Sequence, residues 1–379
     1  MRIVVACDKF KGCLSAPDVA RAMEAGLHSA DPSAEVDLCP LADGGEGTVE
    51  ALVTATGGKF VTCRVTGPLP EMKVEARFGI LGDRKTAVIA MSAASGLALL
   101  RPENFDPMRA TTFGTGELMM AAAALGVERI ILGLGGSATI DGGLGCAQAC
   151  GLPVILEDGE PVSWGEPLTA ADLPKVVLIK HGRGSAIERI SVIGACDVDN
   201  PLLGPRGAAA VFGPQKGALA EQVKTLDASL AQLATRTGKQ AFTEIPGAGA
   251  AGGLGFGLAA FFGAKLRSGI DMLIEATELR ERLAHADWCL TGEGRFDSQS
   301  MAGKVVCGVA RACRDSKLPC IVLAGSVETG LELGDTGVSA CFSICDGPMS
   351  GEEAIARAES LIAAAAGNIL RCRGKENAE

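Results

Sequence analysis

The sequence contains few of the residues that several common active sites need. It has no tyrosine, two tryptophans and three histidines, which are His28, His181 and His285. No two of its 14 cysteines are spaced as Cys-x-x-Cys. This supply suits neither a zinc site nor a hydrolytic triad built on histidine. The scattered cysteines are expected to be reduced and mostly buried thiols.

Positive charge and long apolar runs are also scarce. The formal net charge is −10 at pH 7, which opposes a general attraction to nucleic acid or to anionic lipid. The apolar run at the start of the chain is too short for a signal peptide, and no run is long enough to cross a membrane. We therefore expect a cytoplasmic protein that acts on small molecules.

Glycine, in contrast, is abundant. The chain has 51 glycines in 379 residues, roughly twice the ordinary usage, and they lie in short clusters between periodic segments. Clusters of this kind are typical of tight loops close to ligands. The apolar content of 47% is ample for burial, and the length predicts two domains.

Strand-like runs alternate with helical patterns near both ends of the chain. Residues 3–7 and 35–39 are each followed by a polar, glycine-containing loop and a helical pattern, and Ser15 with Asp18 marks the start of the first helix. The same order recurs after the apolar runs at 288–290, 319–324 and 338–345. This alternation predicts an α/β fold with a parallel sheet covered on both faces.

The middle of the chain is less regular. Residues 74–80 and 86–91 are expected to form an antiparallel pair of strands, and long helices are expected at 219–235 and 270–286. We place a second α/β domain at residues 82–285. Hydrophobic periodicity alone does not show whether the two chain ends pack together.

Five polar loops follow predicted strands, and ligands of open parallel sheets bind outside the carboxyl ends of the strands. For each loop the alternative is a hydrated surface turn, a helix cap or an Asx turn. The candidate residues are Asp8 and Lys11 in the first loop; Asp43, Gly44, Gly45 and Glu46 in the second; Gly135, Gly136, Ser137, Thr139 and Asp141 in the third; Asp197 and Asn200 in the fourth; and Glu293, Arg295, Asp297, Gln299 and Lys304 in the fifth.

These residue types suit phosphate and metal chemistry. The glycines of residues 133–145 can bring backbone N–H groups close to a phosphate chain, with hydroxyl groups beside them. The carboxylates and exposed N–H groups of residues 42–48 suit a metal, a hydroxyl or an anionic oxygen. A carboxylate such as Asp197 could accept the proton of a substrate hydroxyl or hold magnesium.

One further motif is interpreted as structural. Residues 247–252, GAGAAG, match the Gly-x-Gly-x-x-Gly pattern of dinucleotide-binding proteins, but turn-like residues and Pro246 precede them where that pattern requires a buried strand. We expect these small residues to allow close helix packing.

The ordered motifs together resemble one known family. The sequence is similar to bacterial glycerate kinases of the glycerate 2-kinase type over nearly its whole length. The motifs that carry the resemblance are DKFKGCLSA (8–16), ADGGEGT (42–48), GTGEL (114–118), GGSATIDGG (135–143), CDVDNPLLG (196–204), VFGPQKGA (211–218), PGAGAAGGLGFG (246–257) and TGEGRFDSQSMAGK (291–304).

The resemblance implies ATP-dependent phosphorylation of D-glycerate with Mg²⁺, usually at the 2-hydroxyl. It also implies two α/β domains, with a Rossmann-like parallel-sheet domain formed by residues 1–81 and 286–379, an inserted domain at 82–285, and the active site in the cleft between them. Ala90 departs from the family, which commonly has glutamate there, and this bears on how glycerate is oriented.

We assign the residues to the three needs of phosphoryl transfer, which are charge neutralisation, in-line placement and a proton acceptor. Lys11, Arg295 and Lys304 are expected to contact phosphate or the glycerate carboxylate, Asp197 to accept the proton, and residues 135–143 to line the ATP phosphates. The magnesium ion and the substrate hydroxyl would be bound by Asp43, Glu46, Glu293 and Asp297. The sequence does not say which of these four residues binds which.

Two alternatives remain at this point. The chain could phosphorylate the 3-hydroxyl or another small hydroxy acid, or it could be a nucleotide- or metabolite-binding regulator without turnover, for which Ala90 is the motivation. No nucleic-acid or membrane partner is expected, and a homo-oligomer is compatible with the sequence.

Overall fold

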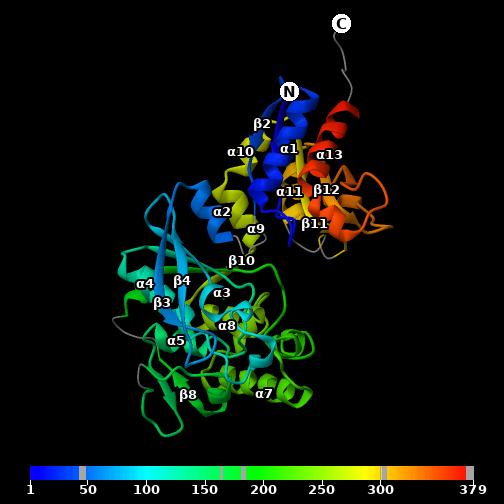
Figure 1. The fold of residues 1–379 in the computed structure, drawn as a ribbon. Helices are drawn as coiled ribbons and strands as arrows, with labels where there is room; N and C mark the ends of the chain where they lie inside the picture. The colour runs from blue at the N-terminus through cyan, green and yellow to red at the C-terminus, as the bar shows by residue number, and fades with distance from the viewer. Residues whose placement is uncertain (42–47, 163–164, 181–184, 299, 301–304, 373–379) are drawn as a thin grey trace. The chain divides into compact units, whose positions relative to one another are not determined.

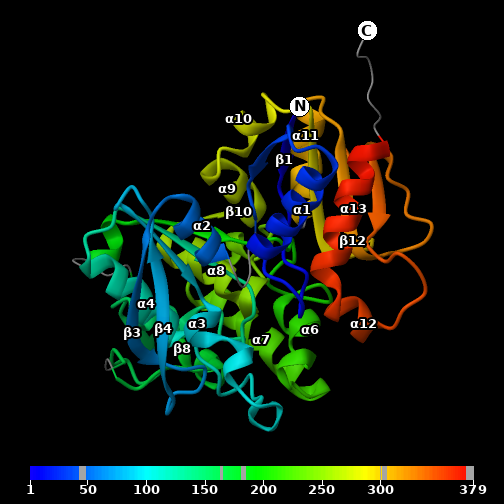
Figure 2. The same cartoon turned by 45° about the horizontal axis from the view of Figure 1, so that its top comes forward.

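The computed structural model describes residues 1–41, 48–162, 165–180, 185–298, 300 and 305–372 (Figures 1 and 2). The chain divides into two compact units. The terminal unit comprises Met1–Asp43 and Ile270–Glu379, and the central unit comprises Gly44–Gly269. No helix among the described residues is long and apolar enough to span a membrane.

The terminal unit is built on a five-stranded sheet with the order β13-β12-β11-β1-β2, in which every neighbouring pair is parallel. Its strands are β1 (Arg2–Val5), β2 (Glu35–Leu38), β11 (Trp288–Phe296), β12 (Cys320–Val327) and β13 (Ala340–Ser343). Its helices are α1 (Ala16–Ala30), α9 (Gly269–Ala276), α10 (Leu279–Leu283), α11 (Val305–Asp315), α12 (Gly351–Ala356) and α13 (Ala358–Cys372). Both chain ends therefore contribute to one sheet.

Helices α1 and α13 pack side by side on one face of this sheet (Figures 1 and 2). Ile3, Val5, Leu290 and Leu323 of the strands join both helices in one buried cluster. The two helices approach closely because Gly26 has no side chain, and a methyl group there would overlap the Ala363 carbonyl oxygen. Helix α1 starts as predicted, with the Ser15 hydroxyl accepting from the Asp18 N–H.

The central unit is built on a six-stranded sheet with the order β10-β9-β6-β5-β4-β3. Its strands are β3 (Lys59–Thr66), β4 (Lys73–Ile80), β5 (Thr86–Ala90), β6 (Arg129–Gly133), β9 (Ser191–Ala195) and β10 (Lys265–Arg267), with β7 (Val154–Leu156) and β8 (Val176–Ile179) forming a separate pair. Its helices are α2 (Thr48–Ala55), α3 (Ser92–Ser95), α4 (Phe113–Ala124), α5 (Leu144–Ala149), α6 (Ala208–Phe212), α7 (Ala220–Arg236) and α8 (Ala250–Phe262).

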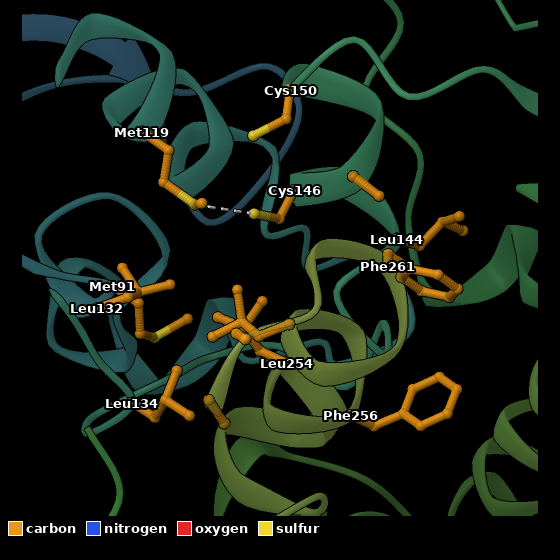
Figure 3. Packing of buried hydrophobic residues seen from close by; sticks show 14 of the residues in the cluster. Met91, Met119, Leu132, Leu134, Leu144, Cys146, Cys150, Leu254, Phe256 and Phe261 are labelled. Carbon is orange, nitrogen blue, oxygen red and sulfur yellow. Dashed lines mark hydrogen bonds between the residues drawn. The ribbon is translucent and has the colours of Figure 1, made fainter. Parts of the chain in front are cut away.

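Strands β10, β9, β6 and β5 are parallel, whereas β4 pairs antiparallel with β5, as the sequence predicts, and β3 antiparallel with β4. Helices α4, α5 and α8 enclose a core in which the Cys146 thiol lies 3.5 Å from the Met119 sulfur (Figure 3). Phe256 and Phe261 of α8 pack edge to face, with ring centroids 5.6 Å apart.

The predicted fold class, two α/β units with a parallel sheet from both chain ends, is confirmed. The unit boundaries differ from those expected after residues 81 and 285. Strands β3 and β4 extend the sheet of the central unit through β5, so residues 59–80 belong there. At the other boundary, Arg282 pairs with Asp37 at 2.5 Å and Arg311 with Asp271 at 2.5 Å, which ties α9 and α10 to the terminal unit.

Three local predictions need correction. The expected helix at 270–286 is two helices, because Glu278 takes a left-handed conformation with φ 52° between α9 and α10. The spacing of Ser350 and Glu353 in the sequence is that of a capping box and predicts the start of the last helix. In the structure, Ser350 caps α12 and not the last helix, α13. Strand β11 continues to Phe296, since residues 292–296 pair with β12. The first six residues of the motif 291–304 are therefore strand and not loop.

Candidate functional site

A cavity of about 460 Å³ opens at the carboxyl ends of the strands in the terminal unit. It lies where β1 and β11 are neighbours, and the chain continues from β1 to β2 on one side before returning to β11 on the other. This position is the topological switch point of the sheet, where two successive connections leave in opposite directions and open a crevice. Residues from the loop after β1 and from the end of β11 line the cavity.

Two carboxylates form the acidic part of this cavity. Asp8 follows β1 and is 7% exposed, and Glu293 lies on β11 and is 8% exposed. The Asp8 N–H donates to the Gly292 carbonyl oxygen at 2.9 Å, which fixes the loop after β1 against β11. Oδ1 of Asp8 accepts from the Lys9 N–H at 2.7 Å. Strand pairing and this turn thus place both acids on one cavity.

Two cationic side chains also line the cavity. Lys11 is exposed in the loop after β1, and Arg295 lies two residues beyond Glu293 on β11. The Arg295 Nε lies 3.1 Å from Oδ2 of Asp297. Oδ1 of Asp297 accepts from the Ser300 N–H at 3.1 Å. Asp297 thus holds a turn and pairs with the guanidinium of Arg295.

The lining also includes apolar side chains. Phe10, Ile344, Ala354, Ile355 and Ala358 contribute to it. Ile355 on α12 is 55% exposed. The lining of the cavity therefore combines charged and apolar side chains.

The glycine loop of the central unit turns its polar side chains inward. Ser137, Thr139 and Asp141 are all buried, whereas Gly136 is exposed. Asp141 Oδ2 accepts from the Thr112 N–H at 2.8 Å and the Thr112 hydroxyl at 2.7 Å, and Oδ1 accepts from the Gly143 N–H at 3.1 Å. The Asp141 carboxylate thereby fastens the loop to Thr112 at the start of α4 and, through the Gly145 N–H, to α5. Five residues of this loop were expected to contact ATP. Of these, Gly135 is partly exposed and Gly136 is exposed, whereas the other three are buried.

Lys216, which the sequence analysis did not single out, is buried against the glycine loop. It is 2% exposed, and its Nζ donates to the Ser137 Oγ at 2.6 Å and to the Thr139 carbonyl oxygen at 2.8 Å. Burial lowers the pKa of Lys216 to about 7, with the Asp141 carboxylate acting in the opposite direction. Burial likewise raises the pKa of Asp141, against its hydrogen bonds from Thr112, Gly143 and Gly145. The signal available in the sequence was the lysine of the motif VFGPQKGA.

Asp197 and Asn200 lie in the central unit after β9. Oδ1 of Asp197 accepts from the Gly269 N–H at 2.8 Å, at the start of α9, and from the Ser268 hydroxyl at 3.3 Å. The Asn200 side chain donates to the Arg206 carbonyl oxygen at 2.7 Å. Ala90 ends β5 beside Gly133, directly before the glycine loop. Asp197 is exposed and held by a helix terminus, so its carboxylate has a defined orientation.

The other predicted residues fall outside the described part of the chain. These are Asp43, Gly44, Gly45, Glu46, Gln299 and Lys304. The motif GAGAAG, in contrast, is described and follows the short 3-10 turn Gln240–Phe242 and not a strand. A side chain on Gly252 would overlap the Thr139 carbonyl oxygen, and the Gly142 N–H donates to the Gly252 carbonyl oxygen at 3.2 Å. Its interpretation as a packing motif is therefore supported by the contacts.

The described residues contain no group of three or more His, Cys, Asp or Glu side chains arranged to hold a metal ion. Magnesium in nucleotide-dependent enzymes is commonly held by one or two carboxylates together with substrate phosphates and water. Asp8 and Glu293, which line one cavity, match that donor set.

Comparisons with known proteins agree along almost the entire chain. The model of the glycerate kinase family matches residues 3–373. The chain is 45% identical over 376 residues to a glycerate kinase of Halalkalibacterium halodurans, covering 97% of both chains. It is 42% identical over 377 residues to the glycerate 2-kinase of Escherichia coli, again covering 97% of both. A crystal structure of a protein assigned as glycerate kinase 2 from Salmonella typhimurium LT2 superimposes with a TM-score of 0.85, 42% identity and 98% coverage of both chains.

Proposed function

Because this chain belongs to the glycerate kinase family and is an enzyme of the kinase class, we propose that it transfers the terminal phosphoryl group of ATP to the 2-hydroxyl of D-glycerate. The products would be 2-phosphoglycerate and ADP. The observation that supports this reaction most directly is the cavity that combines the carboxylates of Asp8 and Glu293 with the cations of Lys11 and Arg295. Phosphoryl transfer consists largely of positioning and charge stabilisation, and these residues supply both.

Lys11 and Arg295 would neutralise the negative charge of the transferring phosphoryl group. Arg295 can offer a planar, bidentate donor set to phosphate oxygens, and its contact with Asp297 limits the directions in which the guanidinium points. Lys11 would act as a mobile point charge, since its side chain is exposed. The two cations have complementary roles in this assignment.

Asp8 and Glu293 would hold Mg²⁺ that arrives with the nucleotide. The ion would supply charge neutralisation between the terminal phosphates of ATP. Both carboxylates are more than nine-tenths buried, and bringing such charges to one cavity is costly unless a cation accompanies them. The donor chemistry therefore fits magnesium.

Asp197 is the proposed proton acceptor for the glycerate hydroxyl. A general base has to be held in one orientation, and the Gly269 N–H fixes Oδ1 of Asp197. Asn200, three residues further, is proposed to contact substrate. Ser137, Thr139 and Asp141 are left out of the proposed ATP contacts because they are buried. The backbone N–H groups of Gly135 and Gly136 are kept as proposed hydrogen-bond donors to phosphate, because Gly135 is partly exposed and Gly136 is exposed.

The test is ATP turnover by the purified full chain with D-glycerate and Mg²⁺, with the product offered to enolase alone or to enolase plus phosphoglycerate mutase. Signal with enolase alone identifies the 2-phosphate. Signal that needs the mutase identifies the 3-phosphate and overturns the proposed regiochemistry. ATP binding without ADP production, with glycerate and with a panel of small hydroxy acids, would overturn the kinase assignment and favour a binding protein.

A further inference from the structure

Lys216 carries a buried charge that the assignments above leave without a role. It ends the short 3-10 turn Pro214–Lys216, and the residue is 2% exposed. Burying an ammonium group costs free energy, and an apolar side chain of similar length would fill the same space without that cost. The charge at this position therefore calls for a functional explanation.

The hydrogen bonds of the Lys216 side chain are made to the glycine loop. Its Nζ donates to the Ser137 Oγ at 2.6 Å and to the Thr139 carbonyl oxygen at 2.8 Å. Asp141 is the acidic side chain whose charge acts on Lys216, and its carboxylate is buried and hydrogen-bonded within the unit. Lys216 is therefore fastened to the loop from its buried side.

The start of the same loop presents two hydrogen-bond donors at the surface. Gly135 is partly exposed and Gly136 is exposed, and within the described part of the chain their N–H groups donate to no acceptor. The loop is anchored on both sides of them, because the Leu134 N–H and the Ala138 N–H donate to backbone carbonyl oxygens at 3.0 Å and 2.9 Å. Successive N–H groups held in a turn in this way favour the binding of an anion.

We propose that Lys216 is a positioning residue for phosphate binding at this loop. By holding Ser137 and Thr139, it fixes the turn that presents the Gly135 and Gly136 N–H groups, and it places a positive charge behind them. This inference rests on the proposed kinase function and adds to it a residue that does not itself touch the substrate. A buried charge is screened less by water and salt than an exposed one, so it attracts a bound phosphate more strongly than a surface lysine at the same distance.

The ionisation of Lys216 gives this role a measurable consequence. Burial lowers the pKa of Lys216 to about 7, with the Asp141 carboxylate acting in the opposite direction. An anion bound at Gly135 and Gly136 stabilises the ammonium form and raises this pKa. At pH 8 the amine of the ligand-free protein is largely neutral, so binding of the anion takes up protons. By linkage, the affinity for the anion falls as the pH rises from 7 to 9.

Isothermal titration calorimetry of the full chain tests this inference, with Mg²⁺ and the non-hydrolysable ATP analogue AMP-PNP as the probe. Titrations at pH 8 in two buffers of different ionisation enthalpy give the number of protons taken up on binding. Wild type should take up more protons than Lys216→Met, and the protonation of the nucleotide itself cancels in this difference. At pH 7 the Kd of Lys216→Met should be roughly tenfold higher, the size expected for a unit charge acting through several ångströms of protein.

Lys224→Met is the matched control, because Lys224 is 74% exposed and pairs with Glu221 on the surface of the same unit. Its Kd and its proton uptake should equal those of wild type. Equal Kd and equal proton uptake in Lys216→Met and wild type would overturn the inference. A higher Kd of Lys216→Met with unchanged proton uptake would show that the lysine only supports the loop, and would contradict the role of its charge.

A second variant separates the charge of Lys216 from its hydrogen bond. Ser137→Ala removes the hydroxyl that ties Lys216 to the loop and keeps the ammonium group. Its Kd for AMP-PNP should rise less than that of Lys216→Met, and its proton uptake should stay close to that of wild type. If Lys216→Met does not fold, an unchanged Kd of Ser137→Ala at pH 7 would contradict the inference.

These outcomes are separable from the reaction itself. A wild-type protein that shows the Lys216-dependent proton uptake with AMP-PNP but phosphorylates no hydroxy acid would contradict the proposed function and leave the role of Lys216 in place. Phosphorylation of D-glycerate by wild type, together with unchanged AMP-PNP binding in Lys216→Met, would support the proposed function and overturn the role of Lys216.

Discussion

The Nζ of Lys216 lies 2.6 Å from the Oγ of Ser137, inside the central unit, although 79 residues separate them in the sequence. The same Nζ donates to the Thr139 carbonyl oxygen at 2.8 Å. A buried ammonium group is expensive unless it is hydrogen-bonded and near an opposite charge. Here the hydrogen bonds come from the glycine loop and the opposite charge from Asp141. Lys216 therefore locks the conformation of residues 137–141.

The lowered pKa of Lys216 predicts a specific dependence of stability on pH. The pKa is about 7 in the folded protein and 10.5 ordinarily, so between these values the unfolded chain binds more protons and the free energy of unfolding rises with pH. Lys216→Met removes this contribution. The difference between wild type and variant, measured by urea unfolding from pH 7 to pH 9, should grow by up to about 1.4 kcal/mol per pH unit. Parallel stability curves would show that Lys216 titrates normally.

Because α8 packs tightly against the glycine loop, we expect that one added methyl group at Gly252 lowers the free energy of unfolding substantially. Gly252 has φ 66°, and a side chain there would overlap the Thr139 carbonyl oxygen. Gly252→Ala should lower the free energy of unfolding by about 2–5 kcal/mol, combining backbone strain with overpacking. Gly126→Ala is the control, because Gly126 has φ 78° with open space around it, and it should lose about 1–2 kcal/mol. If chemical denaturation gave the same loss of stability for Gly252→Ala and Gly126→Ala, backbone strain alone would account for the loss, and the contact with Thr139 would contribute nothing.

The sequence predicted the elements whose signals are local. The Ser15 cap, the antiparallel pair β4 and β5, and the packing role of GAGAAG depend on residues close together in the chain. The extension of β11 was missed because residues 292–296 are glycine-rich and charged. Their strand conformation is stabilised by pairing with β12, through contacts such as Glu293 with Ala324. Periodicity cannot report a partner strand that is distant in sequence.

In the candidate site, too, the features with local sequence signals were predicted, and those that depend on distant contacts were missed. Asp8, Lys11, Glu293 and Arg295 were predicted from their position after strands, and the sheet order brings them to one cavity. Burial of Lys216 and of Asp141 depends on contacts between α4, α5, the glycine loop and the turn at residues 213–217. A polar residue in a glycine loop looks the same in sequence whether it faces a ligand or the core. Only the tertiary contacts distinguish these cases.

Because Asp197 is held by a hydrogen bond that asparagine can also make, we expect Asp197→Asn to lower kcat without lowering the stability of the fold. In Asp197→Asn the side-chain oxygen can still accept from the Gly269 N–H, so the thermal midpoint should stay close to wild type. The amide cannot accept the hydroxyl proton, and kcat should fall about 100-fold or more. Asp199→Asn is the control, because Asp199 is highly exposed and pairs with Arg206 at the surface. A folded Asp197→Asn protein with near wild-type kcat would remove Asp197 from the mechanism.

We expect that replacing Arg295 by alanine weakens the binding of an anionic substrate. Its side chain is 71% exposed and its Nε lies beside the Asp297 carboxylate, so Arg295→Ala should leave the fold intact. Hydrogen bonds to charged groups contribute about 1.5–3 kcal/mol, and KM for ATP should therefore rise roughly 10- to 100-fold. Arg206→Ala removes an equally exposed arginine that pairs with Asp199, and its kinetics should match wild type. If Arg295→Ala kept both the ATP and the glycerate KM unchanged, the end of β11 would be structural only.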